Sequence, residues 1–150
     1  MRLGAPTVQL ADLVAAEQRT RENADAARRE FLDFLDGFRH TTVLVPLDER
    51  DGLWSAELGG IRWIMAFSDE EALADFARAR SALDGAAPRE WDYRKILGSR
   101  LLDSVVPAVG VPCGVALDAA SEDGRVLPPV EGIVPDRATV EAYVNDGGRE

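Results

Sequence analysis

The chain has 150 residues, and its 17 basic and 27 acidic side chains give a formal charge of −10. The length suits a single domain, the apolar fraction of 46% argues against a wholly disordered chain, and the acidic balance disfavours binding of nucleic acid. One Cys and one His are too few for an intrachain disulfide framework or a self-contained zinc site.

The first segment, residues 7–38, is predicted to be helical because Gly and Pro are absent from it until residue 37. Apolar side chains recur at helical spacing in its second half, so we expect a packed helix over residues 24–38. A second helix, less firmly docked, is expected before it. The sequence therefore predicts an N-terminal helical arm, residues 1–23, followed by one α+β domain, residues 24–150. The arm either binds a protein partner as an amphipathic helix, or it caps the domain's own core or frays.

A strand followed by a hairpin is predicted next. Residues 41–47 are apolar and β-branched, which suits a buried strand. Residues 53–58 and 61–67 flank Gly59–Gly60, a two-residue hairpin signal that also sets the register. The expected cross-strand pairs on the apolar face are Leu58–Ile61, Ala56–Trp63 and Trp54–Met65. On the opposite face, Glu57 is expected to form an ion pair with Arg62.

A helix is predicted to follow the hairpin and to pack on the sheet. Ser68 and Glu71 have the spacing of a capping box, and the helix is expected to end before Gly85. Its predicted buried stripe consists of Ala72, Leu73, Phe76, Ala77 and Leu83. The predicted fold is thus a small mixed or antiparallel sheet with a central hairpin, covered by helices.

The remaining segments give a less regular pattern. Residues 86–95 resemble a loop or a short strand, and Ser99 is expected to cap a short helix that stops before Pro107. A buried strand is predicted from about Gly114, followed by a turn over residues 118–124. Pro135 is expected to open a final helix.

The sequence offers no catalytic constellation. A Cys–His pair would have to join Cys113 to His40, but a Cys within an apolar run is typical of a core residue. The acidic turn with Asp118 and Glu122 leaves open a small enzyme with a carboxylate site or the Cys113 thiol. We predict no catalytic residue, no metal ligand and no cofactor.

The aromatic residues suggest an interaction surface. Trp54 and Trp63 are expected in the core, on one face of the hairpin. Trp91 has Arg and Tyr neighbours, a composition typical of interface anchors. The predicted interaction residues are Arg89, Trp91, Tyr93 and Arg94.

In order along the chain, these segments resemble the SseB amino-terminal domain family of bacteria. The resemblance rests on "FLDFLDGFRHTTVLVPL", "IRWIMAFSDEEALADFARAR", "GSRLL" and "VALDAASEDGRVLPP", and covers roughly residues 30 to 135. It implies an α+β domain with no established enzymatic activity and no known cofactor. Actinobacterial relatives often lie near secretion loci, which implies an accessory or immunity-like role.

We therefore expect a non-enzymatic, cytoplasmic domain that binds a protein partner. The opening residues lack the apolar core of a signal peptide, and no apolar run reaches the roughly 20 residues that a membrane span needs. Neither a membrane nor nucleic acid is expected as a partner. The alternatives are the small enzyme described above and a self-associating structural domain that forms a homo-oligomer.

Overall fold

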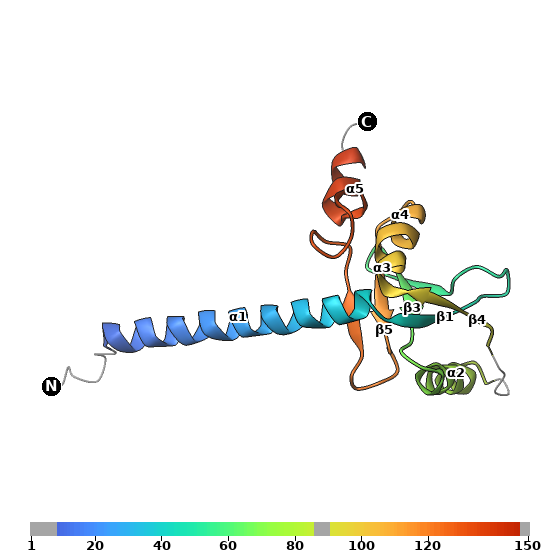
Figure 1. Ribbon diagram of the computed structural model, residues 1–150, viewed down its shortest axis with the longest axis horizontal. Coiled ribbons are helices and arrows are strands. Elements are labelled where there is room, and N and C mark those ends of the chain that lie inside the picture. The colour runs from blue at the N-terminus through green and yellow to red at the C-terminus, as the bar shows by residue number, and fades with distance from the viewer. Residues whose placement is uncertain (1–8, 86–90, 148–150) are drawn as a thin grey trace. The chain divides into compact units, whose positions relative to one another are not determined.

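The fold is α+β, as the sequence predicts (Figure 1). The computed structural model describes residues 9–85 and 91–147, with side chains described as far as residue 144. The chain divides into two compact units, Met1–Gly37 and Phe38–Glu150. The first unit contains most of one long helix, and the second contains all the strands of the described residues.

Helix α1 runs without interruption from Leu10 to Arg39. The predicted break between two helices near residue 23 is therefore wrong, and the helix continues across the expected boundary between arm and domain. The middle of α1 consists mostly of Ala, Arg, Glu and Gln, which are strong helix formers even when exposed. A salt bridge of 2.9 Å between Glu17 and Arg21 adds helical support one turn apart. No helix in the described part of the chain, α1 included, is long and apolar enough to cross a membrane.

The strands form two small sheets. Their bounds are β1 Thr42–Pro46, β2 Ser55–Leu58, β3 Ile61–Ala66, β4 Tyr93–Leu97, β5 Cys113–Leu117 and β6 Arg125–Leu127. One sheet pairs β1 with β4, and the other has the order β2-β3-β5-β6, in which only the β3–β5 pair is parallel. Two backbone hydrogen bonds of 2.8 Å between Leu44 and Phe67 join the sheets. The four-stranded sheet is therefore mixed, in agreement with the prediction.

The β2–β3 hairpin has the predicted register. Leu58 faces Ile61 and Ala56 faces Trp63, because Gly59 and Gly60 both adopt the positive φ angles (63° and 82°) of a tight hairpin turn. Two details differ from the prediction. The predicted Glu57–Arg62 ion pair is not formed among the described residues: the two lie opposite each other, but Nη1 of Arg62 donates to Oγ of Ser55. Leu58 is 75% exposed, since no helix covers the tip of the hairpin.

Helix α2, Glu70–Asp84, begins and packs differently from the prediction, although it ends at Gly85 as expected. Its N-cap is Asp69, whose carboxylate accepts a hydrogen bond of 2.8 Å from the backbone N–H of Ala72, so the predicted Ser68 cap is wrong. The buried stripe ends at Ser81, whereas Leu83 is 80% exposed. Ser81 lies two turns after Leu73 on the same face, but Leu83 points to a different side of the helix.

Three short helical pieces follow β4 as one continuous segment: α3 Gly98–Arg100, the π-helical η1 Leu101–Val105 and α4 Val106–Ala108. The predicted stop before Pro107 is wrong, because Pro107 lies inside the segment. Proline lacks an N–H and crowds the preceding turn, and the wider π turn just before it avoids part of that conflict. Ser99 lies within α3 and does not cap it, because the N-cap is Leu97.

The C-terminal helix is also split. Pro135 precedes a short 3-10 helix, η2 Asp136–Ala138, rather than the final α-helix. Thr139 then adopts an extended conformation with ψ of 156°, and α5 extends over Val140–Gly147. The Thr139 hydroxyl accepts a hydrogen bond of 3.2 Å from the backbone N–H of Ala142. Thr139 therefore precedes the first turn of α5, and the prediction that the final helix begins at Pro135 is wrong.

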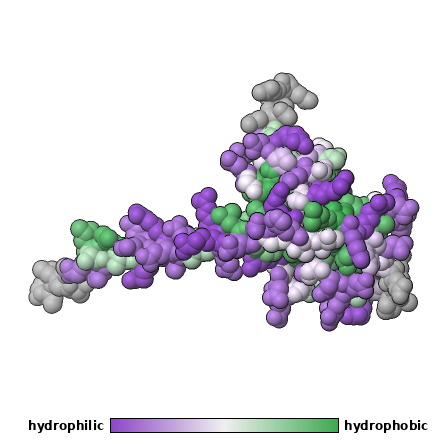
Figure 2. All heavy atoms as spheres, viewed as in Figure 1, coloured by the Kyte–Doolittle hydropathy of each residue, from purple (hydrophilic) through white to green (hydrophobic). Residues whose placement is uncertain are grey.

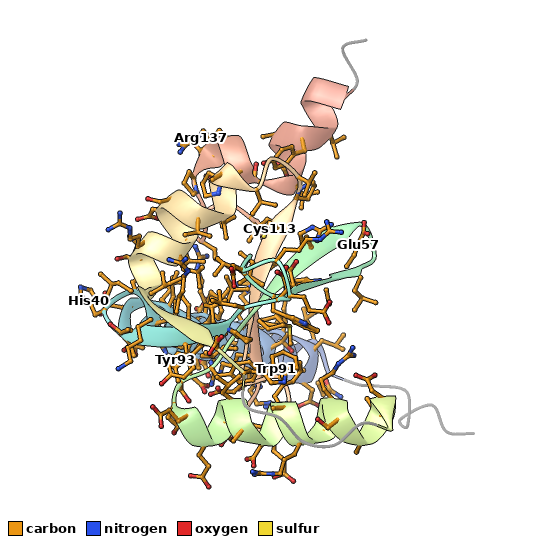
Figure 3. All side chains as sticks on the ribbon, turned by 90° about the vertical axis from the view of Figure 1, so that its right-hand side faces the viewer. His40, Glu57, Trp91, Tyr93, Cys113 and Arg137 are labelled. Carbon is orange, nitrogen blue, oxygen red and sulfur yellow. The ribbon has the colours of Figure 1, made fainter. Side chains whose placement is uncertain are left out.

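Both faces of the sheets are covered by helices (Figures 1 and 3). Helix α2 lies on one side of the strands, and α3, η1 and α4 lie on the other. The core on the α2 side contains Leu44, Met65, Phe67, Leu73, Phe76 and Ala116, with Trp54, Trp63 and Trp91 packed against it. Val43, Val45, Ile64 and Val115 alternate with these core residues along their strands, so they face η1 and α4. Trp54 and Trp63 are thus packed on the core, as predicted.

Candidate functional site

Two tryptophans, Trp54 and Trp91, line a hollow of about 460 Å³. We call it the Trp54–Trp91 hollow. Its lining comes from three segments: the loop between β1 and β2, the last turns of α2, and the residue that leads into β4. The lining residues are Leu47, Asp48, Glu49, Arg50, Trp54, Arg80, Asp84 and Trp91. Figure 3 shows Trp91 between α2 and the strands.

Aromatic packing holds the two tryptophans in place. Phe76 of α2 contacts both rings edge-on, with centroid distances of 5.4 Å to Trp54 and 5.8 Å to Trp91. The two indoles lie 5.9 Å apart, and Phe67 packs on the far side of Phe76 at 5.1 Å. Edge-to-face contacts of this kind are favourable and directional. The tryptophans are therefore rigid, half-buried groups rather than loose surface side chains.

The loop that forms one wall is organised by Asp48. Oδ1 of Asp48 accepts hydrogen bonds from the backbone N–H groups of Arg50 (2.8 Å) and Gly52 (2.9 Å). The backbone N–H of Asp48 in turn donates to the carbonyl of Gly52, and Asp51 occupies the left-handed region at φ 64°. Asp and Asn are the residues that most often stabilise turns in this way. This acidic turn thus forms a fixed wall of the hollow.

The charges around the hollow are mixed. The guanidinium carbon of Arg80 lies 5.4 Å from the centre of the Trp54 ring, a cation–π arrangement. Arg50 supplies a second cation, and Asp48, Glu49 and Asp84 supply carboxylates. Aromatic rings bordered by arginine are the usual composition of energetically important interface residues. The hollow has this composition over rigid rings, so it suits recognition of another molecule's side chains.

The predicted interaction residues are not all brought together. Trp91 lines the hollow, but Tyr93 lies in β4 and its hydroxyl donates to Oε1 of Glu70 at 2.7 Å. That hydrogen bond raises the pKa of the Tyr93 phenol, with burial adding to the effect. Arg94 is exposed on β4 and is not among the lining residues, and Arg89 lies outside the described residues. Trp91 is thus the one described residue of the predicted set in the hollow's lining.

Sequence reasoning missed Trp54 and Arg80 as parts of this site. Trp54 was expected in the core, and it does pack there, but its ring also lines the hollow. Arg80 follows the buried Phe76 and Ala77 by about one helical turn, so it lies at the border of the buried stripe. The available signal was the position of Trp54 two residues after the charged turn 48–52, where a core residue lies close to the surface.

The Cys113 thiol is a core group. Cys113 is fully buried, and burial raises its pKa to about 11. The thiol is therefore protonated at neutral pH, whereas a nucleophilic cysteine needs a lowered pKa. Figure 3 shows Cys113, at the start of β5, well apart from His40, which lies in the turn before β1. The structure does not bring this Cys and this His together.

Asp118, one of the two carboxylates of the other predicted enzyme site, has a structural role. Asp118 has a positive φ of 52°, and its two oxygens accept hydrogen bonds of 2.8 Å from the backbone N–H and the hydroxyl of Ser68. These bonds tie the turn after β5 to the start of α2. A neighbouring hollow of about 250 Å³ contains Asp118, but not Glu122. Among the residues that the structure describes, no group of three or more His, Cys, Asp or Glu side chains could hold a metal ion.

Comparison with known proteins adds no further identification. No family model, no curated protein and no solved structure matches the chain.

Proposed function

We propose that the chain is a non-enzymatic domain of the SseB type that acts in the cytoplasm and binds a protein partner through the Trp54–Trp91 hollow. The single observation that carries the proposal is the pair of half-buried indoles, fixed by Phe76 and bordered by Arg80. Rigid aromatic rings lose little conformational freedom on binding, so the apolar area that they bury contributes efficiently to affinity.

The order of the elements supports the SseB part of the proposal. In the family that the sequence resembles, we expect three features in order. They are a helix leading into a strand, a strand ending at Phe67-Ser68 before an acidic helix, and a strand before a turn and a Leu-Pro-Pro segment. The chain has α1 before β1, β3 before α2, and β5 before the turn and β6, in that order. The buried, protonated thiol of Cys113 supports the non-enzymatic part against the thiol alternative.

An affinity capture with matched variants tests the proposal. The tagged chain is incubated with extract of its native host at physiological salt, and captured proteins are quantified by mass spectrometry. Arg80→Ala removes the guanidinium that lies over Trp54, while Arg78→Ala removes an exposed arginine from the same helix that does not line the hollow. Both changes leave a helix-favouring residue in an exposed or half-exposed position, so neither is expected to unfold α2.

The proposal expects one protein to be enriched by the wild-type chain and by Arg78→Ala, and reduced at least about tenfold by Arg80→Ala, as for an interface residue at the centre of a contact. Equal capture by all three forms would place the contact elsewhere and contradict the proposed site. Capture of no specific protein by the wild-type chain would contradict the proposed function.

A further inference from the structure

Helix α1 has apolar ends and a polar middle. Leu10, Leu13 and Val14 in its first turns are 75%, 56% and 53% exposed, and Figure 2 shows them as a hydrophobic patch followed by a hydrophilic stretch. Near the other end, Phe31 and Phe34 are partly buried and their rings lie 6.1 Å apart. Between the two ends, every described side chain from residue 16 to residue 30 is exposed.

The apolar positions follow the spacing of a coiled coil. Steps of three and four residues alternate along one face of α1 without a break, which is the a/d pattern of a heptad repeat. The residues at these positions are Leu10, Leu13, Glu17, Thr20, Ala24, Ala27, Phe31 and Phe34. Six of the eight are apolar. In proteins most of the stability of a helix comes from packing of its apolar face, so such a face is expected to be covered by another helix.

We propose that α1 pairs with α1 of a second copy of this chain in an antiparallel coiled coil. In this register, Leu10 of one copy packs on Phe34 of the other, and Leu13 packs on Phe31. Every a position then faces a d position of the second helix, and each apolar end of one helix covers the opposite apolar end of the other.

Charge complementarity favours this orientation over a parallel one. A parallel pair in register places Glu17 against Glu17 in the seam, where two like charges repel. The antiparallel pair avoids this contact: it places Glu17 against Ala27, next to Arg28 of the second copy, and the two-fold symmetry repeats this opposite-charge contact. Arg21, which already pairs with Glu17 of its own helix, lies on the same edge as Arg28. Thr20 and Ala24 form the central layers, and their small side chains allow the helices to approach closely.

The length of α1 also fits the proposed pairing. The part of α1 in the first unit extends from Leu10 to Gly37, which spans roughly 42 Å. The proposed register aligns its first turn with the last turns before Phe38, where the second unit begins. The pairing therefore uses the helical part of the first unit from end to end.

Sedimentation equilibrium of the full chain over a range of concentrations tests the pairing. The wild-type chain is expected to be a dimer, and Leu13→Arg is expected to weaken the dimer at least about a hundredfold, because two apolar contacts are lost in each pair. Leu83→Arg, at a position on α2 that is 80% exposed, is the matched control and is expected to leave the dimer intact. A monomeric wild-type chain, or equal weakening by both variants, would overturn the proposal.

Disulfide trapping tests the orientation. A mixture of Leu13→Cys and Phe31→Cys chains is expected to form a 13–31 cross-link under mild oxidation. Leu13→Cys alone is expected to remain uncross-linked, because the two residues 13 are roughly 27 Å apart in the antiparallel pair. Cys113 does not interfere, since it is fully buried. Rapid cross-linking of Leu13→Cys with itself would show a parallel pair and overturn the proposed arrangement.

A charge exchange tests the contact that selects the orientation. Glu17→Arg and Arg28→Glu are each expected to weaken the dimer, and the double variant is expected to restore it. The Glu17–Arg21 salt bridge within α1 is exposed, and its loss alone contributes little. If the double variant recovers no affinity, the Glu17–Arg28 contact does not form, and the proposed antiparallel register is contradicted.

Discussion

At the scale of single residues, close packing fixes two glycines that no turn requires. A Cβ atom on Gly98 would lie 1.9 Å from the carbonyl oxygen of Phe38, and one on Gly114 would lie 2.6 Å from the ring of Trp63. Gly98 also donates its backbone N–H to the carbonyl of Thr41 at 2.8 Å. The start of α3 therefore lies directly on the chain that leads into β1, with no space for a side chain between them.

Gly98→Ala is expected to destabilise the protein by more than about 3 kcal/mol, because backbone atoms rather than a flexible side chain block the new methyl group. Gly37→Ala in α1 is the control: a Cβ there meets nothing within 4 Å, and alanine favours a helix by about 1 kcal/mol over glycine. Urea unfolding followed by circular dichroism measures both changes. Similar midpoints for Gly98→Ala and the wild type would contradict the close approach of α3 to Phe38.

A pH-dependent ion pair also belongs to this scale. Nη1 and Nη2 of Arg39 donate hydrogen bonds to the two carboxylate oxygens of Asp103, at 3.0 and 2.7 Å. These bonds hold the pKa of Asp103 below the usual range of a carboxyl group. Because the folded state has the lower pKa, the pair stabilises the protein above the unfolded pKa and loses its effect as the pH falls through the folded pKa.

Asp103→Asn is therefore expected to lower the free energy of unfolding at pH 7 by at most about 1 kcal/mol, since both side chains are partly exposed to solvent. The difference from the wild type is expected to disappear as the pH falls through the lowered pKa of Asp103. Urea titrations at several pH values measure this difference. A constant difference across the whole range would show that the pair contributes through packing rather than charge.

At the scale of elements, the start of α2 gives a direct test of the observed cap. Asp69→Ala is expected to destabilise the protein by about 1 kcal/mol, because the N–H of Ala72 loses its acceptor, and Asp69→Asn is expected to retain most of that stability. Glu71→Ala is expected to change the stability by less than about 0.5 kcal/mol, since Glu71 is exposed and the observed cap does not use it. Thermal unfolding of the three variants separates the observed cap from a Ser68–Glu71 capping box, which would make Glu71→Ala the costly change.

The elements that could be predicted are those whose signals are local. The hairpin register follows from Gly59–Gly60 and the alternation beside it, and the structure has that register. The cap of α2 could not be predicted in the same way, because Ser68 and Asp69 are both good N-cap residues. Asp118, 50 residues further along the chain, binds Ser68 and leaves Asp69 as the cap. A choice of this kind depends on tertiary structure.

The candidate site could be predicted only in part, for the same reason. Trp91 has a local signal, its Arg and Tyr neighbours. The hollow itself arises where a loop, the end of α2 and the start of β4 meet. Nothing in the sequence near Arg80 indicates that its guanidinium lies over Trp54. The sequence thus yields the aromatic anchor but not the residues that surround it.

At the scale of the whole molecule, the two proposals use different units. The Trp54–Trp91 hollow belongs to the unit Phe38–Glu150, and the proposed helix pairing belongs to Met1–Gly37. The two can therefore fail separately: Arg80→Ala is expected to reduce partner binding without changing the oligomeric state, and Leu13→Arg is expected to do the reverse. A variant that impaired both functions would indicate a single shared surface.

Hydrogen exchange of the chain, alone and with its captured partner, tests the central claim most directly. We predict that the partner slows exchange in peptides covering residues 47–54 and 80–84, which contain the lining of the hollow, and leaves peptides of η2 and α5 unchanged. Protection confined to η2 and α5, with none in the segments around Trp54 and Arg80, would contradict the hollow as the binding surface.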